Sequence, residues 1–404
     1  MRHFDDWVES FITYTEGLQS PELFRRWAAI TTIACALQRK TFANVSTQVL
    51  WPNMFVLLIA GPGIGKSNAI KTARHLLKQV ARVALTPARI TPRAFYHELE
   101  ASQAEKETIE EIEELYTHAS LAGMIDEFSV FVRPNATEFM CDLADLYDCT
   151  ALFEYKTSTQ GENKAYNCLI NLIGGATPAY LKEAWTATVL GQGFPARCIV
   201  VYSDDKIQVE MDLDTTRELT PDSEIVDESM EENLVLDLRT IADLKGKFIW
   251  TVQAAKELVG WENLGMPPIP EDERLKDYIT RRKVHVIKIA MATCAARDDG
   301  MGITLSDLET SRDLLLETER LMLQAIEPLG ASPYRDAMIL VRKFVTGMHK
   351  RGHSTVPENR LRQILINEVD PVRINHILNE MVLANWLDCT GEAPGRRFFP
   401  GSVE

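Results

Sequence analysis

The chain has 404 residues and a mass of 45.6 kDa, which suits two or three domains. Hydrophobic residues make up 46% of it and charged residues 25%, a balance that excludes a disordered, collagen-like or coiled-coil protein. No apolar run reaches the 18 residues of a membrane-spanning helix, no secretory signal opens the sequence, and seven scattered cysteines favour reduced thiols. We therefore expect a soluble cytoplasmic protein without a membrane partner.

The formal net charge is −15, and the acidic residues concentrate in two stretches. Residues 204–232 contain 12 acidic and 2 basic side chains, and residues 98–114 contain 8 glutamates and one lysine. Residues 335–400 differ, with 10 basic and 7 acidic side chains, a local balance of +3. Because binding follows the local field, the overall charge does not exclude DNA as a partner.

The first half of the sequence alternates predicted helices and strands. Residues 1–50 are predicted to be helical, because Trp7, Phe11 and Tyr14 share one face and a second apolar stripe follows. A Glu-rich stretch at 93–117 predicts another, exposed helix. Apolar runs of strand length occupy residues 54–60, 82–90, 121–125, 168–174 and 198–202. Strands separated by helices predict an α/β fold with a mostly parallel sheet.

The second half is predicted to be mainly helical. The acidic residues 204–235 predict a mobile loop or linker. Residues 236–328 predict helices, notably 278–296 and 306–326. A Gly-Ala-Ser-Pro break at 330–333 then separates a last segment of helices and a hairpin.

The most specific motif is Ala60-Gly-Pro-Gly-Ile-Gly-Lys-Ser67, which follows a predicted strand and opens a predicted helix, the context of a P-loop. Its glycines let backbone N–H groups close around phosphates, while Lys66 reaches the β- and γ-phosphates and Ser67 ligates Mg²⁺. We therefore expect ATP and Mg²⁺ as cofactors. The predicted nucleotide-binding residues are Gly61, Gly63, Gly65, Lys66 and Ser67.

The apolar run Leu121–Ile125 ends in Asp126 and Glu127, the form of a Walker B element about 60 residues after the P-loop. Asp126 would hold Mg²⁺ through water, and Glu127 would polarise the attacking water. A glutamate beside the aspartate favours hydrolysis over binding alone. The alternative is a solvated strand end.

Two later elements of the sequence indicate which class of P-loop protein it resembles. An apolar strand ends at Thr177, and Arg197 stands just before the next strand. The order P-loop, Walker B, polar strand end and arginine before a strand resembles the AAA+ ATPases, particularly the helicases of superfamily three. The resemblance implies that Thr177 is sensor 1 and that Arg197 is an arginine finger offered in trans to a neighbour's γ-phosphate. A surface salt bridge is the alternative for Arg197.

Residues 25–325 also resemble a prophage and mobile-element family of P-loop proteins described as primase–helicase-like. The matching runs are Trp51-Pro-Asn-Met-Phe-Val, Leu146-Tyr-Asp148, Glu154-Tyr-Lys156, Gly174-Gly-Ala-Thr-Pro and Gly193-Phe-Pro-Ala-Arg197. The resemblance implies a replication ATPase in a bacterial host cytoplasm. No zinc finger or primase segment precedes the P-loop, so primase activity is not expected.

Residues 153–168 alternate in polarity and carry a polar tip, which predicts a β-hairpin before the sensor 1 strand. In helicases of superfamily three a hairpin at this location projects a lysine into the central pore. The resemblance implies that Lys156 and Lys164 contact single-stranded DNA. An ordinary exposed hairpin is the alternative.

An amphipathic stretch from Tyr278 resembles the helical lid of AAA+ proteins, in which an arginine acts as sensor 2. Arg281 and Arg282 are both candidates, and spacing does not choose between them. A solvated basic face is the alternative. His285 lies among apolar neighbours and is expected in the core.

The last segment predicts a winged helix, with three short helices and a basic hairpin. Its third helix would offer polar side chains to a DNA groove, and the wing would contact phosphates. A winged helix that docks a protein is the alternative. The candidate DNA contacts are Arg373, Asn375, His376 and Asn379 on the helix and Arg396 and Arg397 on the wing.

Together these expectations describe a ring-forming ATP-driven DNA motor, a replicative helicase that assembles as a homo-hexamer and translocates on single-stranded DNA. Duplex DNA and a replication protein are further candidate partners. A helicase loader or initiation switch is the main alternative, and an ATP-dependent defence or anti-defence protein is a third. The predicted domains are a helical N-terminal segment (1–50), an AAA+-like P-loop core (51–235), a helical lid (236–330) and a winged helix (331–404).

Overall fold

The structure is a computed structural model that describes residues 2–401 apart from 105–106, 109–114, 158–160, 186–188, 190–192, 208–220, 271, 327–333, 367–368 and 392–394. The chain divides into two units, residues 1–329 and 330–404, each with its own hydrophobic core. The predicted segments 1–50, 51–235 and 236–330 fall within the first unit, apart from the last residue of the third.

A five-stranded sheet forms the centre of the first unit, and each of its four pairings is parallel. Its central strands are short runs of wholly buried residues, as both faces of a parallel sheet require. The predicted α/β class and mostly parallel sheet are confirmed, although the predicted strand 82–90 shrinks to two residues. In spatial order the strands are β11 (Cys198–Tyr202), β3 (Phe55–Ile59), β10 (Cys168–Ala176), β7 (Ala119–Ile125) and β4 (Ala84–Leu85).

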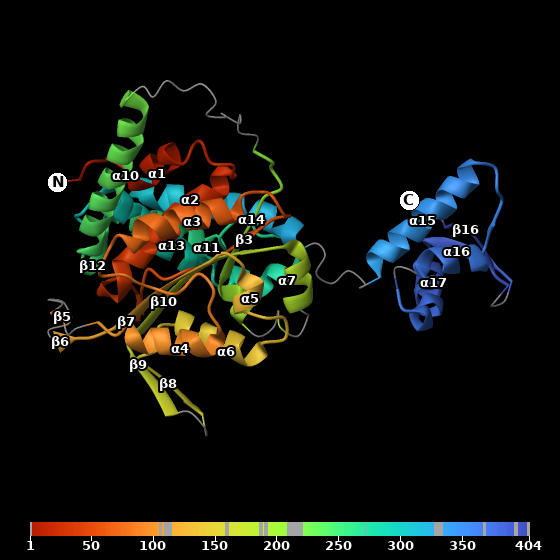
Figure 1. Cartoon of the computed structure of the whole chain (residues 1–404), viewed down its shortest axis with the longest axis horizontal. Coiled ribbons are helices and arrows are strands. Elements are labelled where there is room, and N and C mark those ends of the chain that lie inside the picture. Colours follow the sequence, from red (N-terminus) through yellow and green to blue (C-terminus); the bar gives the residue numbers. More distant parts are fainter. Residues whose placement is uncertain are drawn as a thin grey trace. The chain divides into compact units, whose positions relative to one another are not determined.

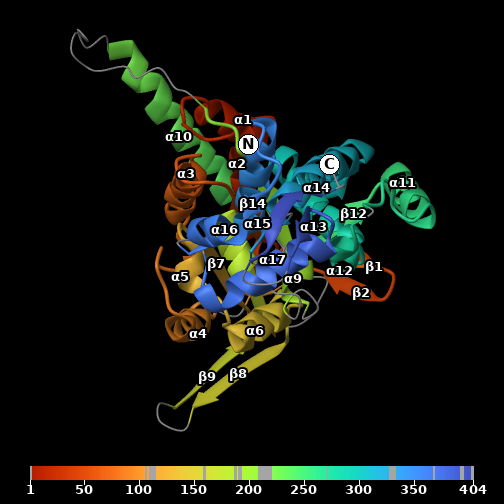
Figure 2. The same ribbon diagram turned by 90° about the vertical axis from the view of Figure 1, so that its right-hand side faces the viewer.

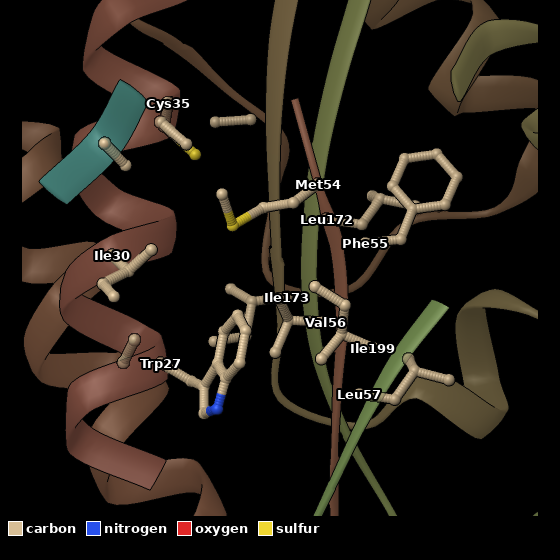
Figure 3. Close-up of a cluster of buried hydrophobic side chains, with 14 of the residues drawn as sticks. Trp27, Ile30, Cys35, Met54, Phe55, Val56, Leu57, Leu172, Ile173 and Ile199 are labelled. Carbon is tan, nitrogen blue, oxygen red and sulfur yellow. The ribbon is translucent and has the colours of Figure 1, made fainter. Parts of the chain in front are cut away.

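Helices cover both faces of this sheet (Figure 1). Helix α2 (Glu22–Leu37) and helix α3 (Lys66–Lys78) lie on one face, and α4 (Pro92–Ala101), α5 (Phe128–Phe131) and α6 (Thr137–Tyr147) lie on the other. Figure 3 shows Trp27, Ile30 and Cys35 of α2 facing Met54, Val56 and Ile173 of the sheet. Because β3 alternates, Phe55 and Leu57 point to the opposite face.

The edge strand β11 is covered by helices from the predicted lid. Helix α14 (Leu305–Ile326) packs along β11, and α13 (Arg282–Arg297) packs between α14 and α2. The indole Nε1 of Trp27 donates a buried hydrogen bond to Thr318 of α14 at 2.9 Å. Shorter helices complete this part: α7 (Pro178–Ala184), α9 (Phe194–Arg197), α11 (Val252–Asn263) and α12 (Lys276–Ile279).

A second sheet corrects the prediction that residues 1–50 are helical throughout. Helix α1 (Trp7–Tyr14) and α2 are helical, but residues 41–50 form two strands. Strand β1 pairs in parallel with a strand about 200 residues later, a contact that no local sequence window contains. The strands of this sheet are β13 (Gly302–Ile303), β12 (Gly246–Trp250), β1 (Thr41–Val45) and β2 (Gln48–Leu50).

The prediction of a linker over 204–235 is wrong from residue 221 on, whereas residues 204–207 form no helix or strand. Helix α10 (Pro221–Ala242) crosses the predicted boundary at 235 and packs against α1, α2 and α3. Two of its carboxylates have tertiary partners, since Glu231 accepts the Tyr14 hydroxyl and Asp237 accepts the backbone N–H groups of His3 and Phe4. The charge pattern of the sequence does not reveal these partners. Residues 208–220 of the acidic stretch lie outside the described residues.

The predicted Glu-rich helix over 93–117 is also wrong beyond residue 101. Helix α4 ends at Ala101, and Ala104 then donates its backbone N–H to His118. Short strands β5 (Glu107–Thr108) and β6 (Leu115–Tyr116) pair antiparallel. Glutamate is a good helix former, but intrinsic propensity is small beside tertiary contacts, so the pairing of residues 103 and 104 with the start of β7 and the residue before it prevails. The intervening residues of this stretch are outside the described part of the chain.

The predicted β-hairpin is confirmed. Strands β8 (Leu152–Thr157) and β9 (Gly161–Tyr166) pair antiparallel, and Figure 2 shows them extending away from α4 and α6. Tyr96 of α4 contacts Phe153 and Tyr155 at the base of the hairpin. The aromatic contacts fix the hairpin to the body of the first unit.

In its described residues the second unit contains three α-helices and a three-stranded antiparallel sheet of order β14-β16-β15. Its core includes Val341, Leu361, Ile377 and Phe398, each fully buried. The elements are α15 (Arg335–Lys350), β14 (Val356–Pro357), α16 (Glu358–Leu365), α17 (Ile374–Leu383), β15 (Leu387–Thr390) and β16 (Arg397–Pro400).

Because the second unit has its own core, residues 330–404 are expected to fold when expressed alone. Phe398→Ala is expected to destabilise this fragment by about 3 kcal/mol or more, enough to unfold a domain of this size. Circular dichroism during heating measures both outcomes, with the exposed Leu383→Ala as control. If the fragment showed no cooperative unfolding transition, the division of the chain into two independently folding units would be contradicted.

Candidate nucleotide-binding site

The P-loop joins the buried strand β3 to helix α3, as the sequence predicts. Gly63 and Gly65 have φ angles of 78° and 87°, in the left-handed region that glycine adopts without strain. At Gly65 a Cβ atom would also collide with the backbone carbonyl of Gln19. The loop connecting α1 and α2 therefore lies against the P-loop, and Asn68 donates to the same carbonyl at 3.2 Å. Sequence reasoning missed this neighbour, because nothing in residues 15–21 forms a motif.

Lys66 lies half-buried at the start of α3. Its ammonium group donates to the backbone carbonyls of Ala60 and Gly61, each at 2.8 Å. Burial lowers the pKa of Lys66, and the nearby Glu127 carboxylate opposes this change. Ser67 follows in the first helical turn. The ammonium group is thus held within the loop whose glycines leave room for phosphate oxygens.

The Walker B residues follow β7 directly, at the same edge of the sheet. Oδ1 of Asp126 is buried without a hydrogen-bond partner in the described structure, and Oδ2 lies 3.7 Å from Nζ of Lys71. Glu127 is exposed, and its carboxylate accepts the Ser129 hydroxyl at 2.7 Å. An unpartnered buried carboxylate oxygen is costly, so it suits a site completed by a ligand.

Thr177 joins these groups at the end of β10. The Ala176 carbonyl accepts the backbone N–H of Ala60, which brings the end of β10 beside the start of the P-loop. Thr177 caps helix α7 by accepting the backbone N–H of Tyr180 at 3.2 Å. A hydroxyl that accepts in this way still has its proton to donate. The arrangement therefore keeps a donor beside the P-loop.

The parallel sheet brings together the residues predicted for nucleotide binding and hydrolysis. A glycine loop, an ammonium group, a serine hydroxyl and an unpartnered carboxylate oxygen form a donor set that suits a phosphate chain with magnesium. Among the described residues no group of three or more His, Cys, Asp and Glu side chains could hold a metal ion by itself. The residues gathered at this edge are Gly61, Gly63, Gly65, Lys66, Ser67, Asp126, Glu127 and Thr177.

Arg197 lies at the opposite edge of the sheet. Register pairs Cys198 with Phe55 and Tyr202 with Ile59, so Arg197 precedes β11 while the P-loop follows β3. Five residues at about 3.3 Å each separate the two edges by about 16 Å. Arg197 binds the carboxylate of Asp148 with two of its nitrogens and donates to the Gly193 carbonyl at 2.8 Å.

The two sensor 2 candidates have different environments, and neither lies at the P-loop. Arg281 contacts Asp148 at 3.5 Å, on the same carboxylate as Arg197. Arg282 is fully buried and makes a two-pronged ion pair with Glu319 at 2.9 and 2.6 Å. Its remaining nitrogen donates to the Met266 and Pro268 carbonyls. Arg282 therefore lies in the core between α13 and α14. The basic residues beside it in the sequence did not predict that its side chain is buried.

The hairpin lysines differ in their surroundings. Lys156 is exposed on β8. Lys164 lies opposite Glu154 in the register, and the two form an ion pair of 2.9 Å. Cross-strand pairs of opposite charge stabilise a hairpin, so Lys164 has a structural partner before any ligand binds.

The predicted DNA contacts of the second unit divide in the same way. Arg373, Asn375, and Arg397 are exposed. Arg396 is mostly buried and binds the fully buried carboxylate of Glu358 at 3.0 Å. The sequence did not reveal Glu358 as a buried anion, because a glutamate at a helix start is ordinarily solvated. His376 and Asn379 are also exposed, and Asn379 accepts a hydrogen bond from Arg396.

Comparisons with known proteins do not identify a family, so the candidate site is argued from its residues alone. No model of a known protein family matches the sequence, and no curated protein matches it. In the described part of the chain, no helix combines the length and apolar character needed to cross a membrane. All seven cysteines are free thiols, as their spacing predicts.

The buried ion pair gives a test of the lid helices. Arg282→Ala leaves the Glu319 carboxylate buried without its partner, so the free energy of unfolding is expected to fall by about 3–5 kcal/mol. Arg281→Ala, which removes a partly exposed neighbour, is expected to cost less than about 1 kcal/mol. Urea unfolding followed by tryptophan fluorescence compares the two. Equal losses would contradict the core role of Arg282.

Proposed function

We propose that this protein is an ATP-hydrolysing, ring-forming DNA motor of the AAA+ type, a helicase that translocates on single-stranded DNA. The observation that carries the proposal is the division of the sheet into two edges. One edge gathers Lys66, Asp126 and Thr177, and the other holds Arg197. A site divided in this way needs a second copy of the chain to complete it.

The strand order supports the AAA+ assignment. The strand that ends at Thr177 lies between the P-loop strand β3 and the Walker B strand β7. All three strands end at the same edge, where nucleotides bind to parallel sheets. The helices after residue 236 stand in the chain position of a lid, and the second unit has the helices and antiparallel strands of a winged helix.

The site residues divide the work of hydrolysis between them. Bound ATP with Mg²⁺ supplies the phosphoryl group and neutralises charge on its oxygens. Lys66 would exchange its two backbone carbonyl partners for phosphate oxygens, and Ser67 and Asp126 would hold the metal. Glu127 is exposed and follows Asp126, so it would orient and deprotonate the attacking water. The hydroxyl of Thr177 would donate a hydrogen bond to the bound phosphate or water.

Arg197 supports a ring rather than a single subunit. It lies about 16 Å from the P-loop of its own chain, farther than an arginine side chain extends. Arg197 could therefore reach only a nucleotide bound to a neighbouring subunit. The P-loop edge of that subunit would have to dock against the edge that carries Arg197. Repetition of this head-to-tail contact closes a ring, for which a homo-hexamer is proposed.

The DNA contacts rest on the hairpin and the second unit. Lys156 is exposed on a hairpin that extends from the body, so it can bind a phosphate of a single strand in the ring's pore. Arg373, Asn375 and Arg397 are exposed on the second unit and suit duplex DNA. Lys164 would have to leave Glu154 first, and Arg396 supports the wing through Glu358.

A second candidate is a helicase loader or initiation switch that binds DNA and a replication partner without unwinding. The same pairings favour it, because Lys164 and Arg396 already have acidic partners within the chain. Cations that already pair with acidic residues contribute less to binding the phosphates of a translocating DNA strand.

Lys66→Ala is expected to lower ATP hydrolysis by about 100-fold or more, because the phosphates lose their charged donor. Lys78→Ala, in the last turn of the same helix, is expected to leave the rate unchanged. A phosphate-release assay on purified protein measures both rates. Normal hydrolysis by Lys66→Ala would refute the assignment of the site.

Arg197→Ala is expected to lower single-strand-stimulated hydrolysis by about 1,000-fold, as loss of an arginine finger does. Mixing it with Lys66→Ala protein should restore part of the rate, because one subunit then supplies the P-loop and the other the arginine. The rate is measured with and without single-stranded DNA. A slow wild-type rate that DNA does not change would favour the loader.

A further inference from the structure

A cluster of charged side chains occupies the edge of the first unit opposite the P-loop. It consists of Asp148 with Arg197, Arg281 and Lys288, which we call the Asp148 cluster. Asp148 follows helix α6, Arg197 ends helix α9 just before β11, Arg281 immediately precedes α13, and Lys288 lies within α13. Three separate segments therefore converge on one carboxylate.

The charges of the cluster do not balance. Asp148 binds two arginines, and the buried Lys288 lines the same cavity as Asp148 and Arg281, so the four side chains carry a formal charge of +2 in a chain whose net charge is −15. His285, beside it, adds no charge, because burial lowers its pKa to about 3. Burial likewise lowers the pKa of Lys288 to about 8, although Asp148 opposes the shift. Surplus positive charge held partly out of water favours an anionic ligand.

The cluster borders a cavity of about 410 Å³, large enough for a phosphate group. Asp148, Arg281 and Lys288 line it, together with Trp51 and Asn53. Lys288 is almost fully buried, donates to Asn53 at 2.6 Å and lies over the Tyr147 ring at 3.8 Å. The cavity thus has the buried cation Lys288 and the partly exposed Arg281 on its walls, while Arg197 binds the Asp148 carboxylate that also lines it.

Asp148 holds the two arginines in the state observed here. It is half exposed, whereas the Arg197 side chain is only 11% exposed and that of Arg281 is 30% exposed. A carboxylate that binds two guanidinium groups at once occupies donors that a phosphate would otherwise receive. Release of both arginines therefore requires a competing anion or the loss of this carboxylate.

We propose that the Asp148 cluster binds the terminal phosphates of the nucleotide held on a neighbouring subunit's P-loop, with Arg281 acting in trans beside Arg197. Asp148 is a positioning residue that holds both arginines until that phosphate displaces it. Arg281 is then not a sensor for its own subunit's nucleotide. This inference rests on the proposed ring function.

A binding experiment tests the proposal with two variants, one that keeps the P-loop but lacks Arg281 and one that keeps Arg281 but lacks Lys66. Arg281→Ala protein keeps its P-loop and binds a fluorescent, non-hydrolysable ATP analogue with Mg²⁺. Lys66→Ala protein, added in excess, supplies Arg281 but no working P-loop. The affinity of the Arg281→Ala protein is expected to rise about tenfold on this addition, the effect of one charge-assisted contact.

Variants of the added Lys66→Ala protein separate the possible causes. A second substitution Arg281→Ala is expected to remove most of the rise, whereas Lys283→Ala, a lysine paired with Glu262, is expected to keep it. Asp148→Asn in the added protein is expected to increase the rise about threefold, a gain that misfolding does not produce. Thermal melting checks that each variant is folded.

The failures are distinguishable. If the Lys66→Ala protein with both arginines produces no rise, the proposed ring is wrong. If it produces a rise that Arg281→Ala in the added protein leaves unchanged, the ring stands and the role of Arg281 is overturned. If Asp148→Asn gives no larger rise, Asp148 does not hold the arginines.

Discussion

Strand β10 is nine residues long, wholly buried, and paired in parallel with β3 on one side and β7 on the other. In its middle the buried Asn171 accepts the backbone N–H of Met54 and donates to the Ala34 carbonyl. One amide side chain therefore joins the central strand to β3 and to helix α2. Because buried polar groups are costly unless paired, this junction fixes the register of the core. Both functional edges depend on that register.

Parallel pairing has a chemical consequence. All the strands end at the same edge, so groups that follow strands gather there and groups that precede strands gather at the other edge. Lys66 and Asp126 follow strands, whereas Arg197 precedes one. The nucleotide site is thus rich in donors but lacks an arginine from its own sheet. In the ring that we propose, a neighbouring subunit would supply one from its Asp148 cluster.

Charge is distributed to match this division. The chain is strongly acidic, yet the Asp148 cluster retains a surplus of positive charge next to a cavity. Elsewhere cations are neutralised locally, as Lys164 is by Glu154 and Arg396 by the buried Glu358. Such pairing reduces the positive charge available to DNA, whereas Lys156 and Arg397 stay exposed, and these are the cations for which we propose contact with nucleic acid.

The sequence by itself determined the features that depend on neighbours along the chain. The glycine-rich loop between a strand and a helix, the hairpin and all five strands of the sheet were predicted, because each follows from a short motif or a local period. The break near residue 330 was visible for the same reason. The strand predicted over 82–90 has only two residues in the structure. The alternation of predicted strands and helices also indicated the α/β class.

Tertiary structure alone decided the rest, since the deciding partners lie far away in sequence. Residues 41–50 became strands because β1 pairs with β12, and residues 221–235 became helical because α1, α2 and α3 cover that helix. Arg281 and Arg282 are adjacent in sequence, yet one reaches Asp148 and the other is buried on Glu319. Successive helical side chains point about 100° apart, so only packing determines which is buried. No spacing rule contains that information.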